Sequence, residues 1–317
     1  MSRNLITGGL GFLGSNLARQ LLKQDQEVLL FDVIPGSKLI EDIKTEVKIV
    51  RGDLGNWAEV LDAVRGNHVD CIYHIGAVIS EAAEDRPATA YMVNANGTFH
   101  VLEAARMFGA SVVFASSTAT FGPGLSHRVN EDTVQRPISM YGVTKAFAEK
   151  LGEYYHRRYK VNFRATRFPS VLGPGRRGGF TAYSSLMIEE LAMGRRVIVP
   201  VSEATQMACL YYKDAVLSLI RLGEADEMRL KRRVYNVQSF STTMEELVAA
   251  VKRHLPEAQI QFRPPQETAR VTGAQLTEVD DTNACQDWGW KPQYGLEEAV
   301  KDFVAEVMAN RALYEAK

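Results

Sequence analysis

The sequence predicts an α/β fold, a doubly wound parallel sheet followed by a smaller mixed C-terminal region. Short apolar runs alternate with segments of helical periodicity through the first half of the chain, and this alternation is typical of a parallel sheet with crossover helices. The first run ends in a glycine-rich turn, and the regular alternation stops near residue 167. The expected strands span residues 4–7, 28–32, 47–50, 71–74, 112–115 and 162–167.

Helices are expected between these strands, because apolar residues recur there every three or four positions. The segments with this spacing are 13–23, 57–64, 93–108 and 140–159. Beyond residue 167 the pattern predicts a helix over 181–193, a strand over 234–237 and a helix over 243–255. Thr243 and Glu246 have the spacing of a capping box at the start of that last helix.

The composition favours small-molecule partners. The 317 residues are 46% hydrophobic and 24% charged, with a net charge of −1, so we expect no binding to nucleic acid and none to a membrane. The first residues lack an apolar signal region, and no apolar run is long enough to span a bilayer. Three widely spaced cysteines argue against a disulfide framework or a zinc site. We therefore expect a soluble, cytoplasmic protein without a bound metal.

The turn after the first strand carries a G-x-x-G-x-x-G motif and leads directly into a helix. Glycines let the chain turn tightly and let a pyrophosphate approach the helix N-terminus, whose free N–H groups favour an anion. Asp32 ends the second strand, 18 residues after the motif, which strengthens the prediction of a Rossmann-type dinucleotide site. The expected residues of this turn are Gly8, Gly11, Phe12, Leu13 and Gly14.

The carboxylate of Asp32 favours NAD over NADP. It would accept hydrogen bonds from the adenosine ribose hydroxyls and would repel the additional phosphate of NADP. Val33 and Ile34 follow where an NADP site would have an arginine. Asp53 and Leu54, after the third strand, are candidates for the adenine end of the site, although a turn carboxylate and a core leucine fit the spacing equally well.

A second set of residues indicates proton transfer. Tyr141 and Lys145 are four residues apart on one helix face, so the lysine ammonium would favour the phenolate form of the tyrosine. Such a tyrosine exchanges a proton with a substrate hydroxyl while hydride moves to or from a nicotinamide. Ser117 or Thr118, at the end of the fifth strand, would orient that hydroxyl.

Taken together, these motifs resemble the extended short-chain dehydrogenase/reductase superfamily, which contains the NAD-dependent epimerases and dehydratases. The resemblance covers essentially the whole chain and implies Ser117, Tyr141 and Lys145 as the catalytic set, with Lys145 also binding the ribose of the cofactor. It also implies a homodimer formed by the helices 93–108 and 140–159. Further segments resemble the parts of the family that surround the cofactor, and they contain Ile75, Gly76, Ala77, Asn94 and Phe168. Residues 1–167 would thus form the NAD-binding domain, with later segments returning to it, and 168–317 mainly a substrate-binding cap.

Within the superfamily, several segments resemble the short-chain type of L-threonine 3-dehydrogenase. In that group the substrate is surrounded by the counterparts of Ser80, of Ser117 or Thr118, of Tyr141 and of Thr181. Arg176, in a glycine-rich loop, could clamp a carboxylate or a phosphate, or simply face solvent. The expected reaction is NAD-dependent oxidation of a secondary alcohol on L-threonine or a related hydroxy acid.

Two alternatives to this reaction remain. A nucleotide-sugar epimerase with tightly bound NAD is the first, and it is weakened by Ser170, which stands where those enzymes usually have an asparagine. A non-catalytic dinucleotide sensor is the second, and the intact Tyr141 and Lys145 count against it.

Overall fold

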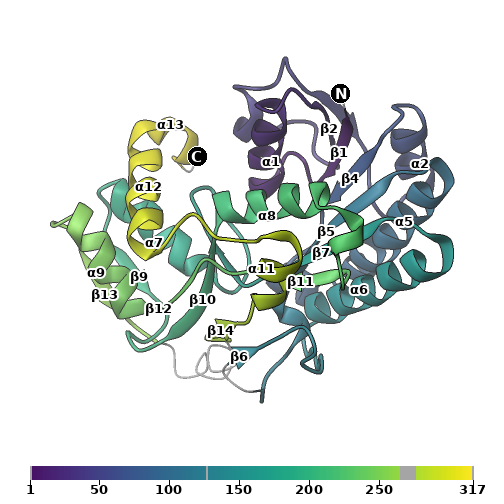
Figure 1. The fold of residues 1–317 in the computed structure, drawn as a ribbon. Coiled ribbons are helices and arrows are strands. Elements are labelled where there is room, and N and C mark those ends of the chain that lie inside the picture. The colour runs from purple at the N-terminus through teal and green to yellow at the C-terminus, as the bar shows by residue number, and fades with distance from the viewer. Residues whose placement is uncertain (1, 126–127, 265–275, 316–317) are drawn as a thin grey trace.

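The computed structural model describes residues 2–125, 128–264 and 276–315. A seven-stranded sheet dominates it, with the strand order β11-β7-β5-β4-β1-β2-β3 and every neighbouring pair parallel (Figure 1). The predicted doubly wound fold is therefore confirmed. The strands are β1 (Arg3–Thr7), β2 (Glu27–Asp32), β3 (Lys48–Arg51), β4 (Cys71–His74), β5 (Ser111–Ser117), β7 (Phe163–Phe168) and β11 (Val234–Asn236).

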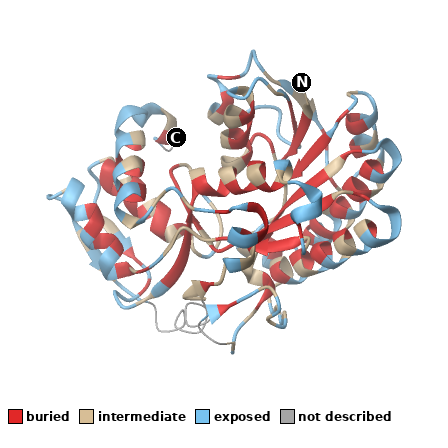
Figure 2. Cartoon of the chain, viewed as in Figure 1, coloured by how far each residue is buried: buried red, intermediate tan, exposed pale blue. Residues whose placement is uncertain are grey.

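Helices cover both faces of this sheet, and their apolar sides supply two separate cores. One core lies beneath α1 and α8, and the other beneath α2, α5 and α6, as the buried inner faces in Figure 2 show. The spacing of the apolar residues predicted four of these five helices to within a few residues. Their bounds are α1 (Phe12–Leu22), α2 (Trp57–Arg65), α5 (Gly97–Phe108), α6 (Met140–Tyr159) and α8 (Tyr212–Glu224).

The helix expected over 93–108 differs from the prediction at its start. Residues Tyr91–Asn96 form a π-helical segment, η2, which runs into α5. The short helices α3 (Ser80–Asp85) and α4 (Pro87–Ala90) precede it. A π-helical turn is wider than an α-helical one and is frequent at functional sites, because it places a side chain where a regular helix cannot.

The C-terminal region is smaller and mixed, as predicted. Its three-stranded sheet has the order β12-β10-β8, with one parallel and one antiparallel pair. Its helix α9 (Met244–His254) begins with the predicted capping box, in which Thr243 and Glu246 each accept the other's backbone N–H. The remaining elements are β6 (Arg128–Val129), β8 (Ser170–Leu172), α7 (Ala182–Ala192), β9 (Val197–Val199), β10 (Gln206–Tyr211), β12 (Phe240–Thr243), β13 (Ile260–Phe262), β14 (Glu278–Val279), α11 (Thr282–Trp288), α12 (Leu296–Ala309) and α13 (Arg311–Tyr314).

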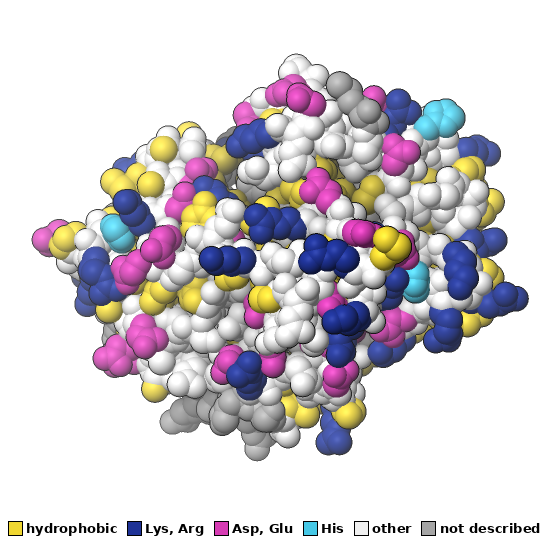
Figure 3. Space-filling view, in the orientation of Figure 1, with side chains coloured by type: hydrophobic (Ala, Val, Ile, Leu, Met, Phe, Trp, Pro, Cys, Tyr) yellow, Lys and Arg dark blue, Asp and Glu magenta, His cyan; other side chains and the backbone are white. Residues whose placement is uncertain are grey.

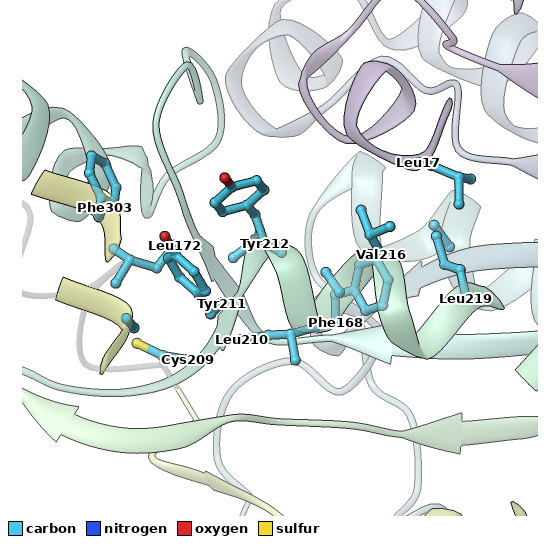
Figure 4. Packing of buried hydrophobic residues seen from close by; sticks show 14 of the residues in the cluster. Leu17, Phe168, Leu172, Cys209, Leu210, Tyr211, Tyr212, Val216, Leu219 and Phe303 are labelled. Carbon is cyan, nitrogen blue, oxygen red and sulfur yellow. The ribbon is translucent and has the colours of Figure 1, made fainter. Parts of the chain in front are cut away.

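The region of the seven-stranded sheet and the C-terminal region share one hydrophobic core. Figure 4 shows Leu17 of α1 and Val216 of α8 in the same apolar cluster as Leu210 of β10 and Phe303 of α12. The chain also returns to the large sheet after residue 168, because α8 packs on β5 and β7 and β11 pairs with β7. A division near residue 167 stays a prediction. None of the helices in the described parts of the chain is long and apolar enough to cross a membrane.

A buried histidine connects β1 and β4 at their carboxyl ends. The Nδ1 atom of His74 accepts from the Thr7 hydroxyl at 2.8 Å, and its Nε2 donates to the Thr98 hydroxyl at 3.0 Å. The Thr7 hydroxyl in turn accepts the N–H groups of Ile75 and Gly76, each at 3.1 Å. This pattern requires a neutral imidazole with its proton on Nε2.

The imidazole of His74 makes the fold acid-sensitive. Burial, followed by the charge of Lys145, lowers the pKa of His74 to about 3, so the unfolded chain takes up a proton near pH 6.5 that the folded chain does not. The free energy of unfolding should therefore fall by up to about 1.4 kcal/mol per pH unit as the pH drops below 6.5. Denaturant titrations at several pH values will show whether His74→Gln reduces this slope. His68→Asn, at an exposed turn, should leave the slope unchanged, and an equal slope in all three proteins would contradict the account.

Candidate functional site

The carboxyl ends of the parallel strands open into a cavity of about 1180 Å³. It extends from the glycine turn after β1 to the loop before α7, and strands β1 and β4 flank the point where the strand order reverses. Ligands of open α/β sheets bind in the crevice at such a reversal. Pockets that bury one drug-sized ligand have volumes of roughly 300–1,000 Å³, and this cavity exceeds that range, as a site for a dinucleotide together with a small substrate would.

The glycine turn packs so closely that side chains are excluded from it. Gly8 has φ +67°, and a Cβ atom there would lie 2.7 Å from the Cα of Gly76. A Cβ on Gly14 would overlap the carbonyl oxygen of Gly8. The N–H of Gly8 is bonded to the carbonyl of Phe31 at 2.9 Å, which fixes the turn against β2. The backbone is thus exposed at the N-terminus of α1, the arrangement that lets a pyrophosphate approach.

Asp32 lies at the rim of the same turn. Its Oδ2 accepts the N–H of Leu10 at 3.1 Å and its Oδ1 accepts the N–H of Ile34 at 3.3 Å, so the carboxylate is held in place from both sides. Asp53 shapes the next loop by accepting the N–H of Gly55 at 2.8 Å, and Leu54 is buried beside it. The cavity lining includes nearly all the residues predicted for the cofactor: Gly8, Gly11, Phe12, Leu13, Gly14, Asp32, Asp53, Leu54, Ile75, Gly76, Ala77, Lys145 and Phe168.

Asn94 is not among the residues that line the cavity, in contrast to its predicted contact with the cofactor. Its side chain is occupied by the protein, because it accepts the N–H of Val78 at 2.8 Å and donates to the carbonyl of Val78 at 2.9 Å and to the hydroxyl of Thr144 at 3.1 Å. Asn94 therefore holds the loop that leads to Ser80, whose φ of +38° is unusual for a residue other than glycine. The π-helical segment η2 carries the side chain to this position.

The proton-transfer residues meet at the opposite end of the cavity. Ser139 caps α6 by accepting the N–H of Gly142 at 3.0 Å, which places Tyr141 in the first turn and Lys145 one turn later. The Nζ atom of Lys145 lies 5.6 Å from the centre of the Tyr141 ring and donates to the carbonyl of Ala115 at 2.6 Å. Ser117, Tyr141 and Lys145 all line the cavity.

The pKa of Tyr141 differs from the expected direction. Burial raises it to about 12, and a hydrogen bond with Ser117 and the charge of Arg176 oppose this increase only in part. Lys145 does not offset it, since its ammonium is directed to Ala115 and burial lowers its own pKa to about 7. Among the groups of the protein, burial therefore has the largest effect on the pKa of Tyr141, and the effect of Lys145 on the phenolate stays a prediction.

The residues predicted for the substrate converge on the loop before α7. A Cβ atom on Gly179 would lie 2.9 Å from Nη2 of Arg176 and 3.5 Å from the Ser80 hydroxyl. The Arg176 Nη2 donates to the Thr181 hydroxyl at 2.8 Å. Ser80, Thr118, Tyr141, Arg176 and Thr181 all line the cavity, although they come from four separate stretches of the chain.

A buried ion pair behind the site is absent from the predictions. Glu149, one turn after Lys145, accepts two hydrogen bonds from Arg167 at 2.9 and 2.8 Å and one from the Ser116 hydroxyl at 2.5 Å. Both charged side chains are almost fully buried. A glutamate four residues after the lysine of a catalytic helix is the pattern that could have indicated it. Among the described residues no group of three or more His, Cys, Asp or Glu side chains is placed to hold a metal ion.

Comparison with known proteins agrees with this geometry. Residues 4–237 match the model of the NAD dependent epimerase/dehydratase family. The mitochondrial L-threonine 3-dehydrogenase of Bos taurus is 32% identical over 94% of this chain and 80% of its own length. The structure of L-threonine 3-dehydrogenase from Trypanosoma brucei superposes with a TM-score of 0.91 at 27% identity and covers both chains fully. That of Thermus thermophilus UDP-glucose 4-epimerase in complex with NAD gives 0.81 at 25% identity, over 97% of this chain and 99% of its own. The chain belongs to the NAD-dependent epimerase/dehydratase family of extended short-chain dehydrogenases/reductases and is an enzyme of that family.

Proposed function

We propose that the protein is an NAD-dependent dehydrogenase that oxidises a secondary alcohol on a small substrate such as L-threonine or a related hydroxy acid. The observation that carries this proposal is the single cavity that joins the glycine turn and Asp32 to Ser117, Tyr141 and Lys145. The similarity to L-threonine 3-dehydrogenases over almost the whole chain supports the same substrate class.

The residues of the cavity fit NAD. The contact between Gly8 and Gly76 excludes side chains from the place where the pyrophosphate would lie, and the oxygens of Asp32 retain lone pairs for ribose hydroxyls. Arg51, on the neighbouring strand, donates to the carbonyl of Val33 and is not part of the lining. When bound, the oxidised nicotinamide supplies the hydride acceptor of the reaction.

Side chains of the protein carry out the proton transfer. The phenolate oxygen of Tyr141 accepts the proton of the substrate hydroxyl, while the hydroxyl of Ser117, in the same cavity, holds the alcohol oxygen in place. Thr118 follows Ser117 at the same strand end and contributes to the lining. Lys145 is anchored by the carbonyl of Ala115 near Tyr141, where its ammonium would also hold the ribose of a bound cofactor.

Net formation of NADH distinguishes this proposal from the epimerase alternative. Purified protein should form NADH from added NAD with at least one substrate among L-threonine, small hydroxy acids and aldonates, as followed by absorbance. Conversion of a UDP-sugar to its epimer in the same samples, without release of NADH, would contradict the proposal. The family resemblance to UDP-glucose 4-epimerase makes this comparison necessary.

Removal of the Tyr141 hydroxyl should abolish oxidation. Tyr141→Phe leaves the substrate proton without its acceptor, and a loss of about 10²–10⁴-fold in kcat is expected with NAD binding retained. Because the pKa of Tyr141 is raised to about 12, the wild-type oxidation rate should increase from pH 7 to pH 10 as the phenolate fraction grows. Tyr159→Phe, at the exposed end of α6, is the control. Unchanged turnover in Tyr141→Phe would sink the mechanism.

The carboxylate of Asp32 should determine the choice of cofactor. Asp32→Ala removes the acceptor for the ribose hydroxyls and the repulsion of a ribose phosphate, so the dissociation constant for NAD should rise about tenfold or more and the preference for NAD over NADP should shrink. Isothermal titration with both cofactors measures the two changes. Asp25→Ala, at a surface turn, should alter neither constant, whereas an unaltered preference in Asp32→Ala would count against an NAD site at this carboxylate.

We also propose a homodimer through α5 and α6, in a cytoplasmic protein. These adjacent helices expose large apolar side chains, including Phe99 at 43%, Val143 at 46% and Phe147 at 48% exposure. On the face drawn in Figure 3, by contrast, Lys and Arg side chains are interspersed with Asp and Glu. The two buried cysteines, Cys71 and Cys209, are free thiols, which agrees with a reducing compartment.

A charge in the apolar face of α5 and α6 should dissociate the dimer. Phe147→Glu places a carboxylate where the partner would bury a ring, so light scattering after size exclusion should give the mass of one chain, against twice 35.3 kDa for the wild type. Met228→Glu, at a residue that is 90% exposed and belongs to neither helix, should remain dimeric. A wild-type protein that is monomeric at micromolar concentration would refute the dimer.

A further inference from the structure

Two adjacent arginines at the cavity have opposite electrostatic surroundings. Arg177 forms an ion pair with the buried carboxylate of Glu189 at 2.6 Å and also donates to the carbonyl of Tyr314. Its charge is therefore neutralised by the fold. The loop Gly173–Gly179 that carries both arginines is held at Gly175, whose N–H is bonded to the second oxygen of Glu189 at 2.8 Å. The position of Arg176 in the cavity follows from this anchoring.

Arg176 donates only to neutral oxygens. Its guanidinium bonds the carbonyl of Val171 at 2.5 Å, the Thr181 hydroxyl at 2.8 Å and the carbonyl of Gly178 at 3.3 Å, with longer contacts of 3.4 Å to the Thr181 carbonyl and 3.5 Å to the Ser170 hydroxyl. Within the described residues, no carboxylate forms an ion pair with it, and the exposed Glu81 acts on its charge only at longer range. The residue as a whole retains some exposure, but its guanidinium is deep enough that burial lowers its pKa to about 10, so it is still a cation at neutral pH.

This charge is directed to the reacting end of the cavity. The Nη2 atom and the Ser80 hydroxyl flank the same space beside Gly179, and the Arg176 charge also acts on the Tyr141 phenol. A buried cation without an anionic partner is costly for a fold, because neutral dipoles replace its hydration only in part. An anionic group on the ligand would complete the charge balance.

We propose that Arg176 is the specificity-determining residue that binds the carboxylate of the substrate, and that the substrate is a small hydroxy acid with a single carboxylate. This inference rests on the proposed function and narrows it. The Nη2 atom donates one N–H to Thr181, which leaves its second N–H for an oxygen of a carboxylate. One cation without an ion-pair partner balances one carboxylate, whereas a phosphate dianion would leave a charge unmatched. The hydroxyls of Ser80 and Thr181 complete the pocket around the anion.

Pairs of alcohols that differ only in the anionic group test the assignment. The pairs are 3-hydroxybutyrate with 3-hydroxybutyramide, and L-threonine with L-threoninamide. Wild-type protein should oxidise the acid of at least one pair with a kcat/KM at least about tenfold above that of its amide. In Arg176→Gln this ratio should fall close to one, mainly through the KM of the acid, and Arg176→Lys should keep part of it. Arg195→Gln, at an exposed arginine paired with Glu190, should keep all of it.

Binding without turnover provides the second readout. Butyrate should raise the melting temperature of wild-type protein more than butyramide or inorganic phosphate does, with NAD present, and the butyrate effect should disappear in Arg176→Gln. If no alcohol yields NADH but this pattern holds, the dehydrogenase proposal fails and the carboxylate site stands. If acid and amide react equally well, or if Arg176→Gln loses both in proportion, the carboxylate site is wrong while the dehydrogenase proposal survives. A larger shift with phosphate than with butyrate would also overturn the assignment.

Discussion

The close approach of the Gly8 turn to the Gly76 segment is the constraint on which the rest of the site depends. A Cβ atom on Gly8 would lie 2.7 Å from the Cα of Gly76, so neither backbone could keep its path with a side chain there. Thr7 and His74 hold the two strand ends together from beneath. The strand order reverses at this point, and the crossover connections depart in opposite directions, which leaves a crevice open to a dinucleotide.

The ionisable groups in the crevice have shifted pKa values because they are deeply buried. Burial raises the pKa of Tyr141 and lowers that of Lys145 and Arg176, so each group is shifted toward its neutral form. The fold neutralises the charges that it uses for support, as in the bidentate pair of Arg167 with Glu149. It leaves Arg176 without a carboxylate among the described residues. Groups with shifted pKa values and incomplete pairing are typical of functional sites, where a ligand completes them.

Local patterns in the sequence predicted the strands of the sheet, four of its five helices and the glycine turn, because these depend on residue spacing and on backbone freedom; α8 was not predicted. The capping box of Thr243 and Glu246 was equally readable. The role of Asn94 could not be predicted from the sequence. A motif shows that an amide is near the site, but not that this amide is hydrogen-bonded to Val78 and Thr144. The pKa of Tyr141 was also out of reach, because it depends on burial by segments far apart in the chain. The different roles of Arg176 and Arg177 rest on Glu189, whose position only the tertiary structure gives.

The fate of the hydride tests the central claim most directly. A hydroxy acid that carries deuterium on its carbinol carbon can be incubated with the protein and NAD, and the products analysed by mass spectrometry. The account predicts that the label leaves the substrate and appears in NADH released to the solution, in proportion to the ketone formed. Label that returns to carbon, in a sugar substrate whose stereochemistry has changed and without free NADH, would contradict it and identify an epimerase.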